Sequence, residues 1–285
     1  MTLLVLGGLL FIGLCLASLS GQALSFFFEG NTRMIYLSQA TTQAILGFIL
    51  PAWLTLRLTG AGSPWKELGI STSPRFLPLI LIIAVMICAI PMLNEIIALN
   101  ESIHFPENLD KIFRMWEKEA GKFTDTILNT TTPGGLFAGI IVIGILTGFA
   151  EEIFFRGALQ KLLIGPGMSP QGAVWLSALI FSLMHFQPFG FIPRMLLGAF
   201  FGYLYLWSGS IWLSSIAHAF NNSLVVITAW LALRGHDCSI LEITGTATDG
   251  TLWLSIASLL ITAGGIVVCA RVIPRNTNQR NGKDD

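Results

Sequence analysis

Two adjacent carboxylates, Glu151 and Glu152, follow an apolar run that extends from Leu136 to Ala150, and Arg156 lies four residues after Glu152. An ionisable side chain within such an apolar segment is costly and is by default a candidate for a functional site. If one helix carries the whole segment and ends near Gly165-Pro166, both carboxylates lie near its middle. The spacing places Glu152 and Arg156 on one helical face, where they can form an ion pair.

Two later apolar segments each contribute a histidine. His185 follows Phe181 by four residues, and His218 precedes Asn222 by four. At about 1.5 Å per residue, His185 lies about 18 Å and His218 about 12 Å along its own helix, counted from one side. Both depths are similar to that of Glu151. We therefore expect the acid and the two imidazoles to form one polar cluster inside an apolar bundle.

The residue types in this cluster are those of a hydrolase that attacks a peptide carbonyl with activated water. Glu151, which has no basic residue four positions away, can act as the general base toward water. His185 and His218 can orient the water or, together with Glu151, bind a divalent metal such as zinc. The amide of Asn222 can donate a hydrogen bond to an oxyanion. A metal-free reaction, with water activated by the glutamate alone, needs the same residues.

Other roles are open for several polar residues. Glu152 is a further catalytic candidate, but we favour a structural ion pair with Arg156 that holds the helix. Asn222 can instead bond a neighbouring helix, and Asn221 points about 100° away from it. Arg194 lies at the start of a later apolar run, where we expect an anchor at the membrane interface, with substrate contact as the alternative.

Composition assigns the chain to the membrane proteins. Of its 285 residues 53% are hydrophobic and 11% are charged, whereas soluble domains carry roughly a quarter charged residues. The formal net charge is zero, which gives no electrostatic reason to expect nucleic acid as a partner. No Cys-x-x-Cys pair occurs among the four cysteines, so we expect them to pack as apolar side chains.

The predicted fold class is all-α: a polytopic membrane helical bundle with about eight transmembrane helices. The apolar runs that predict these spans occupy residues 3–28, 37–58, 76–93, 136–164, 173–189, 192–207, 211–233 and 252–272. Very short links join the fifth, sixth and seventh runs, so we expect those helices to be antiparallel neighbours.

Three regions are expected along the chain. Residues 1–133 form an N-terminal membrane region, in which an amphipathic segment at about 107–128 lies on the membrane surface or caps the bundle. Residues 134–233 form the catalytic core, and residues 234–285 form the last span and a basic tail. An even number of spans puts both termini on one side, and the basic tail predicts that this side is the cytoplasm. The basic residues of the tail are Arg271, Arg275, Arg280 and Lys283.

The polar motifs resemble those of a known family, the CPBP family of intramembrane endopeptidases, which comprises CAAX proteases and bacteriocin-processing (Abi) enzymes. The resemblance covers about residues 135–225 and rests on three motifs that occur in order on separate predicted spans. These motifs are Glu151-Glu152-x-x-x-Arg156, Phe181-x-x-x-His185 and His218-x-x-x-Asn222.

This resemblance implies an eight-helix bundle with a conical cavity, in which Glu151 activates water, His185 and His218 complete the site and Asn222 lies at the oxyanion. The family is labelled a metalloprotease family, so a metal is a possible cofactor. The implied partners are the lipid bilayer and a peptide or prenylated protein, since eukaryotic relatives remove the last three residues of prenylated CAAX proteins. The short connections, without a eukaryotic targeting feature, indicate a bacterial inner (plasma) membrane. The alternative is a non-catalytic membrane immunity or scaffold protein of the same family.

Overall fold

The computed structural model describes residues 1–28, 30–71, 76–164 and 168–273. These residues form helices and turns without a β-strand, so the predicted all-α class is confirmed. The helices, in chain order, are α1 (Thr2–Ser25), α2 (Thr32–Thr42), η1 (Gln43–Ile49), α3 (Leu50–Leu58), α4 (Pro64–Glu67), α5 (Phe76–Cys88), α6 (Ile90–Glu101), α7 (Glu107–Leu128), α8 (Pro133–Gly139), η2 (Ile140–Thr147), α9 (Gly148–Glu152), η3 (Ile153–Gln160), α10 (Lys161–Leu163), α11 (Pro170–Leu183), η4 (Pro188–Gly190), α12 (Phe191–Ser208), α13 (Ile211–Leu233), α14 (Ser239–Ile243) and α15 (Leu252–Val272).

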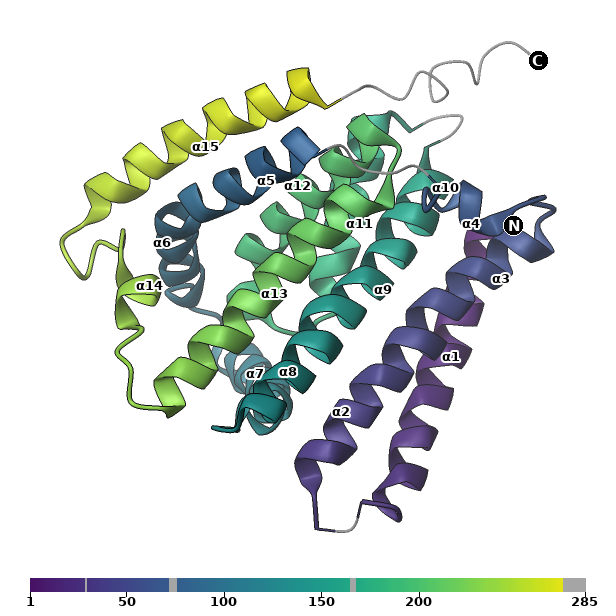
Figure 1. The fold of residues 1–285 in the computed structure, drawn as a ribbon, viewed down its shortest axis with the longest axis horizontal. Helices are drawn as coiled ribbons and strands as arrows, with labels where there is room; N and C mark the ends of the chain where they lie inside the picture. Colours follow the sequence, from purple (N-terminus) through teal and green to yellow (C-terminus); the bar gives the residue numbers. More distant parts are fainter. Residues whose placement is uncertain (29, 72–75, 165–167, 274–285) are drawn as a thin grey trace.

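Elements α8 to α10 form one continuous helix of 31 residues, Pro133–Leu163, which carries the paired carboxylates. It starts where Thr132 caps the first turn, because the hydroxyl oxygen accepts a hydrogen bond of 3.1 Å from the backbone N–H of Gly135. The predicted stop signal at Gly165-Pro166 lies outside the described residues. Figure 1 shows this helix between the α1–α3 hairpin on one side and α11 and α13 on the other.

Among the described residues, five helices are long and apolar enough to cross a membrane, or six if the bent pair α5 and α6 forms a single span. The chain is therefore an integral membrane protein, but this number is lower than the predicted eight. The five are Thr2–Ser25, Pro133–Leu163, Pro188–Ser208, Ile211–Leu233 and Leu252–Val272.

The shortfall has a physical reason in each of three predicted spans. The run at 37–58 does form helices, α2 to α3, but these also carry a polar stretch, Thr41-Thr42-Gln43. The run at 76–93 breaks between Cys88 and Ile90 with a bend of 47°, next to Pro91, which has no backbone N–H to donate. The run at 173–189 yields only the 14 residues of α11, because the chain turns at Phe186, whose φ is +52°.

Helix α7 occupies the segment where the sequence pattern predicts an amphipathic helix. Its apolar side contacts the rest of the protein through aromatic rings. Phe123 stacks on Tyr36 of α2 with centroids 4.8 Å apart, and Trp116 meets Phe186 edge-on at 5.6 Å. The helix therefore covers one side of the bundle, while its position relative to the membrane remains a prediction.

The main apolar core lies where η1 and α3 pack against η3 and α11. All eight residues of η3 are buried, Arg156 among them. The segment that follows the paired carboxylates is thus the most enclosed part of the molecule, and this core fixes its position against the neighbouring helices.

Candidate functional site

Glu152 and Arg156 form a buried ion pair. The Nε atom of Arg156 lies 3.1 Å from Oε2 of Glu152, and neither side chain is exposed (0% for both). The Nη1 atom of Arg156 also donates to the hydroxyl of Ser177 over 3.3 Å, and this hydroxyl donates to the carbonyl of Phe155 over 2.9 Å. The ion pair predicted from the four-residue spacing is present within one helix, and the hydrogen bonds of Ser177 join this helix to α11.

His218 lies between the two glutamates. Its Nδ1 atom is 2.9 Å from Oε1 of Glu152, and its Nε2 atom is 3.6 Å from Oε2 of Glu151. The ring of Phe201 stacks on the imidazole with centroids 5.0 Å apart and an angle of 23°. With Nδ1–H donating to Glu152, the Nε2 atom is directed toward Glu151.

Two glycines bring α13 close enough to place His218 there. A Cβ atom on Gly148 would lie 3.2 Å from the backbone nitrogen of Ala219, and one on Gly144 would lie 2.3 Å from the hydroxyl oxygen of Ser223. Small residues at this crossing let the two helices approach closely, as is common between membrane helices. The four-residue spacing of the glycines puts them on one face, one turn before the carboxylates.

The motif residue Phe181 packs between the two histidines. Its ring centroid lies 4.8 Å from that of His185 and 5.7 Å from that of His218, with edge-on geometry in both pairs. Its backbone carbonyl lies 2.8 Å from Nδ1 of His185. Because that contact occupies Nδ1, the remaining ring nitrogen of His185 is the one available to a ligand.

The asparagine pair lies one turn after His218. The Nδ2 atom of Asn222 donates to the carbonyl of Ile143 over 3.3 Å, and its Oδ1 atom accepts from Nδ2 of Asn221 over 3.3 Å. Both amides line the same cavity. Asn222 therefore has the helix-to-helix bond that the sequence offered as its alternative role, and its second amide hydrogen remains available.

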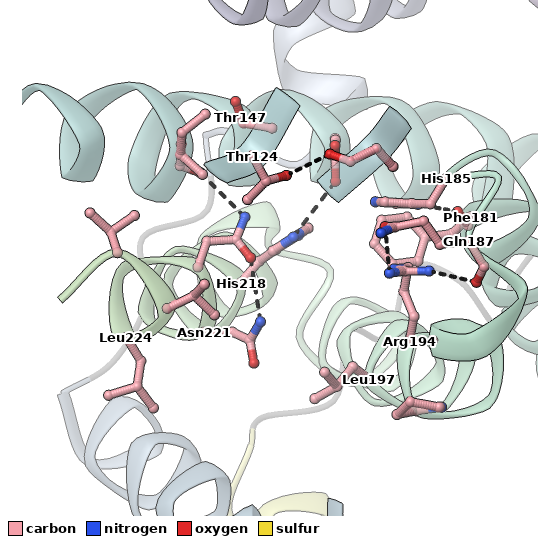
Figure 2. Close-up of a pocket in the computed structure, with 18 of the residues that line it drawn as sticks. Thr124, Thr147, Phe181, His185, Gln187, Arg194, Leu197, His218, Asn221 and Leu224 are labelled. Atoms are coloured by element: carbon pink, nitrogen blue, oxygen red, sulfur yellow. Dashed lines mark hydrogen bonds and ion pairs between the residues drawn. The ribbon is translucent and has the colours of Figure 1, made fainter. Parts of the chain in front are cut away.

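A cavity of about 1190 Å³ joins these groups (Figure 2). The candidate residues in its wall are Glu151, His185, His218 and Asn222. Glu152 and Arg156 are not in the wall, because they lie behind His218. The figure shows His185, Gln187 and Arg194 on one side and His218 with Asn221 on the other. Residues of η1 and α7, outside the predicted core, also line the cavity.

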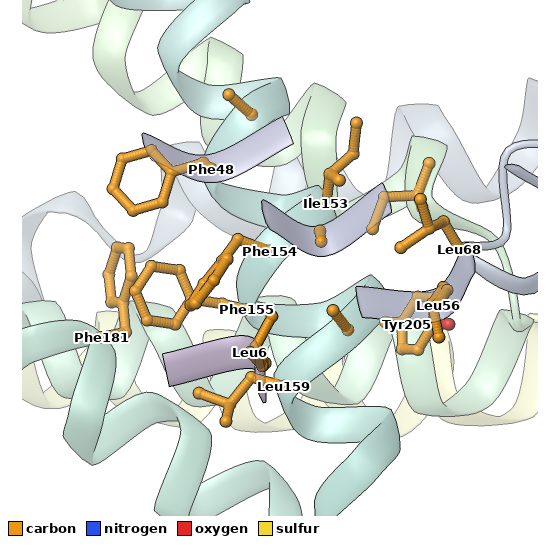
Figure 3. Close-up of a cluster of buried hydrophobic side chains, with 14 of the residues drawn as sticks. Leu6, Phe48, Leu56, Leu68, Ile153, Phe154, Phe155, Leu159, Phe181 and Tyr205 are labelled. Carbon is orange, nitrogen blue, oxygen red and sulfur yellow. The ribbon is translucent and has the colours of Figure 1, made fainter. Parts of the chain in front are cut away.

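An aromatic cluster supports the site from behind (Figure 3). Phe48 of η1 packs on Phe154 and Phe155 with centroids 5.7 and 6.0 Å apart, and Phe155 meets Phe181 edge-on at 5.1 Å. The guanidinium of Arg156 lies 5.2 Å from the centre of the Phe181 ring. Close-packed rings of this kind limit the movement of the helices that carry the polar groups.

The candidate metal ligands His185, His218 and Glu151 are not grouped around one point in this arrangement. Within the described ranges, no group of three or more His, Cys, Asp or Glu side chains is placed to hold an ion. The Nδ1 atom of His218 is engaged by Glu152, and Nδ1 of His185 by a backbone carbonyl. Such bonds are usual for metal-binding histidines too, and they leave Nε2 of each ring as the possible donor. The remaining donors of the predicted set, with Glu151, do not converge on one point.

Sequence reasoning missed part of the cavity wall. Gln187, in the turn after α11, contributes its amide, and Glu117 of α7 contributes a carboxylate. Asn221 also lines the cavity, although helical geometry turns it away from Asn222. The amphipathic pattern of α7 indicated that one face of this helix is buried. It could not indicate that Glu117 on this helix contacts Gln187, which lies 70 positions later in the chain.

Comparison with known proteins agrees with this site. Residues 133–224 match the model of the Rce1-like type II CAAX prenyl endopeptidases. The predicted family resemblance is confirmed. The matched segment runs from the first residue of the carboxylate-bearing helix to two residues beyond Asn222, so it contains every candidate residue of the site.

A curated relative covers part of this chain. The uncharacterized protein YpbD of Bacillus subtilis (strain 168) is 31% identical over 83 residues. The aligned part is 28% of this chain and 39% of that protein, so the chain spans about two fifths of the relative's length. No solved structure matches the chain.

Proposed function

We propose that this protein is an intramembrane endopeptidase that hydrolyses a peptide bond with water activated by Glu151. The observation that carries the proposal is the different environment of the two adjacent carboxylates. Glu152 is buried and shared between Arg156 and His218. Glu151 lines the cavity, and among the described residues its only ion-pair contact is the imidazole of His218 at 3.6 Å. The match of residues 133–224 to the Rce1-like type II CAAX prenyl endopeptidases supports the same class of reaction.

The proposed reaction uses Glu151 first as a base and then as an acid. A separation of 3.6 Å between Nε2 of His218 and Oε2 of Glu151 is long for a direct hydrogen bond, and a water molecule beside both atoms can contact each of them. Glu151 accepts a proton from this water while the water oxygen attacks the substrate carbonyl carbon. When the C–N bond breaks, Glu151 returns the proton to the leaving amine.

The negative charge that develops on the carbonyl oxygen needs a donor. Asn222 has a second amide hydrogen that can face the cavity, and the free ring nitrogen of His185 can donate if it carries a proton. Glu152 serves as a positioning residue, because it holds His218 by Nδ1 and touches no reacting atom. We propose no step through a metal ion, since the donor set does not converge.

We propose a membrane-associated or prenylated peptide as the substrate. Apolar and aromatic side chains line much of the cavity around the few polar groups, as in sites that bind apolar ligands. The proposed setting is a bacterial inner membrane with both termini in the cytoplasm. Of the basic tail that supports this orientation, only Arg271 falls within the described residues. An immunity or scaffold role would need neither the cavity nor the exposure of Glu151 to it.

A cleavage assay tests the proposal. The purified protein, in detergent and in liposomes, is incubated with a farnesylated CAAX peptide and with a pool of single-span membrane peptides, and the products are identified by mass spectrometry. We expect new carboxyl termini that carry one oxygen-18 atom when the reaction is run in labelled water. Folded protein that cleaves no member of either set contradicts a peptidase of this substrate class.

A further inference from the structure

Arg194 is the arginine of the cavity wall, and the proposed reaction does not use it. It lies in the first turn of α12, and its guanidinium packs over Gly190, where a Cβ atom would come within 3.0 Å of Nη2. The side chain faces the same cavity as Glu151 (Figure 2). The interface anchor expected from the sequence would direct it away from the bundle, toward the lipid head groups.

A chain of hydrogen bonds fixes the guanidinium. Its Nη2 atom donates to Oε1 of Gln187 over 2.8 Å, and Nη1 lies 3.5 Å from the backbone carbonyl of the same residue. The Nε2 atom of Gln187 donates in turn to Oε1 of Glu117 over 3.2 Å. An arginine has five N–H donors in a planar fork, so these contacts orient Arg194 and leave donors for a ligand.

The positive charge of Arg194 lacks a counter-ion in direct contact. None of the ion pairs formed by the described residues includes it. Glu117, which is bonded to Gln187, and Glu151 both interact with Arg194 electrostatically, but neither carboxylate touches it. Cations inside membrane proteins are costly and are commonly retained where they bind something. An anionic ligand that enters the cavity would satisfy this charge.

We infer that Arg194 binds a carboxylate of the peptide substrate and so selects the bond that is presented to Glu151. This inference rests on the proposed function and adds a substrate class to it, peptides with a carboxylate near the cleaved bond. The planar fork of a guanidinium matches a carboxylate in two parallel hydrogen bonds. The carboxylate is either the C-terminal one or an Asp or Glu side chain, and the chemistry of recognition is the same for both.

The test uses three forms of each peptide from the cleavage assay: one with a free C-terminus, one amidated, and one with each Asp and Glu replaced by Asn and Gln. We expect the wild type to lose about 10- to 100-fold in kcat/KM when the recognised carboxylate is removed, as for a charge-assisted hydrogen bond. In Arg194→Gln, the ratio of kcat/KM for the peptide with the carboxylate to kcat/KM for the peptide without it falls to about one. Arg194→Lys gives an intermediate ratio. Arg57→Gln, an exposed arginine at the end of α3, keeps the ratio of the wild type.

A binding measurement separates this inference from the proposed reaction. Fluorescent versions of the same peptides are titrated into Glu151→Gln protein and into the double variant Glu151→Gln/Arg194→Gln. Tighter binding of the peptide that keeps its carboxylate, lost when Arg194 is replaced, supports carboxylate recognition. If that result is obtained while no form of the protein cleaves, the inference stands and the proposed function fails. Cleavage or binding with equal preference for all three peptide forms overturns the inference, as does discrimination that survives Arg194→Gln. Absence of both binding and cleavage contradicts both claims.

Discussion

The Nδ1 atom of His218 lies 2.9 Å from Oε1 of Glu152, and both side chains are almost fully buried (6% and 0% exposed). The same carboxylate holds Arg156 through its other oxygen. One glutamate therefore neutralises a buried cation and orients an imidazole, while its neighbour in sequence faces the cavity. This division of roles between adjacent carboxylates underlies the predictions that follow.

Removal of the buried cation should destabilise the fold. In Arg156→Met, Glu152 keeps its charge without its main partner, and loss of one member of a buried ion pair costs about 3–5 kcal/mol of unfolding free energy. The double variant Glu152→Gln/Arg156→Met should recover part of that loss, because no unpaired charge is left. Denaturant unfolding in detergent, followed by tryptophan fluorescence, measures both. Equal stability of wild type and Arg156→Met would show that the pair is not structural.

The stacked ring of Phe201 should control the orientation of His218. We expect Phe201→Leu to lower kcat by about tenfold or more with little change in KM, because a small displacement of a positioned group slows the chemical step. Phe200→Leu is the matched control, since this neighbouring side chain does not line the cavity. If both variants lose the same activity, packing of α12 as a whole is responsible, and the stack has no special role.

The close crossing of α9 and α13 should not tolerate a side chain at Gly148. In Gly148→Leu the new atoms meet the backbone of Ala219, and overpacking of this kind costs about 1–3 kcal/mol. The displacement should also separate His218 from Glu151 and abolish cleavage. Gly134→Leu, in the first turn of the same long helix, meets no atom within 4 Å and should behave as wild type. Full cleavage by Gly148→Leu would contradict the geometry of the crossing.

Chelation should leave the proposed cleavage activity intact. Among the described residues, no group of three or more His, Cys, Asp or Glu side chains is placed to hold an ion, and the proposed reaction activates water with Glu151 alone. After dialysis against EDTA, we expect cleavage rates within about twofold of the untreated protein. A rate that falls to background and returns only when zinc is added would show that the residues rearrange around a metal.

The sequence alone predicted the contacts that depend on helical spacing. Glu152 and Arg156 pair because four residues make about one turn, and His218 approaches the carboxylates because its helix crosses theirs. Depth counting along separate helices placed His185 and His218 near the same level, and both line the cavity. These relationships follow from a constant rise per residue, which holds wherever a helix is regular.

Features set by tertiary packing were beyond the sequence. The left-handed turn at Phe186, which ends α11 early, carries no glycine that would have signalled it. The contact of Gln187 with Glu117 joins residues 70 positions apart, and the orientation of Arg194 depends on that contact. Eight apolar runs correspond to five or six candidate spans among the described residues, because apolar content does not distinguish a membrane-crossing helix from a short buried one.

The most direct test of the central claim compares Glu151→Gln with Glu119→Gln in the cleavage assay. Both changes remove one carboxylate and keep its size, but Glu119 is exposed on α7, outside the cavity. With matched unfolding curves, we predict that Glu151→Gln reduces kcat by at least about 10²-fold, the lower range for loss of a general base, while Glu119→Gln retains wild-type rates. Folded Glu151→Gln protein that cleaves at the wild-type rate would contradict the assignment of Glu151 as the base.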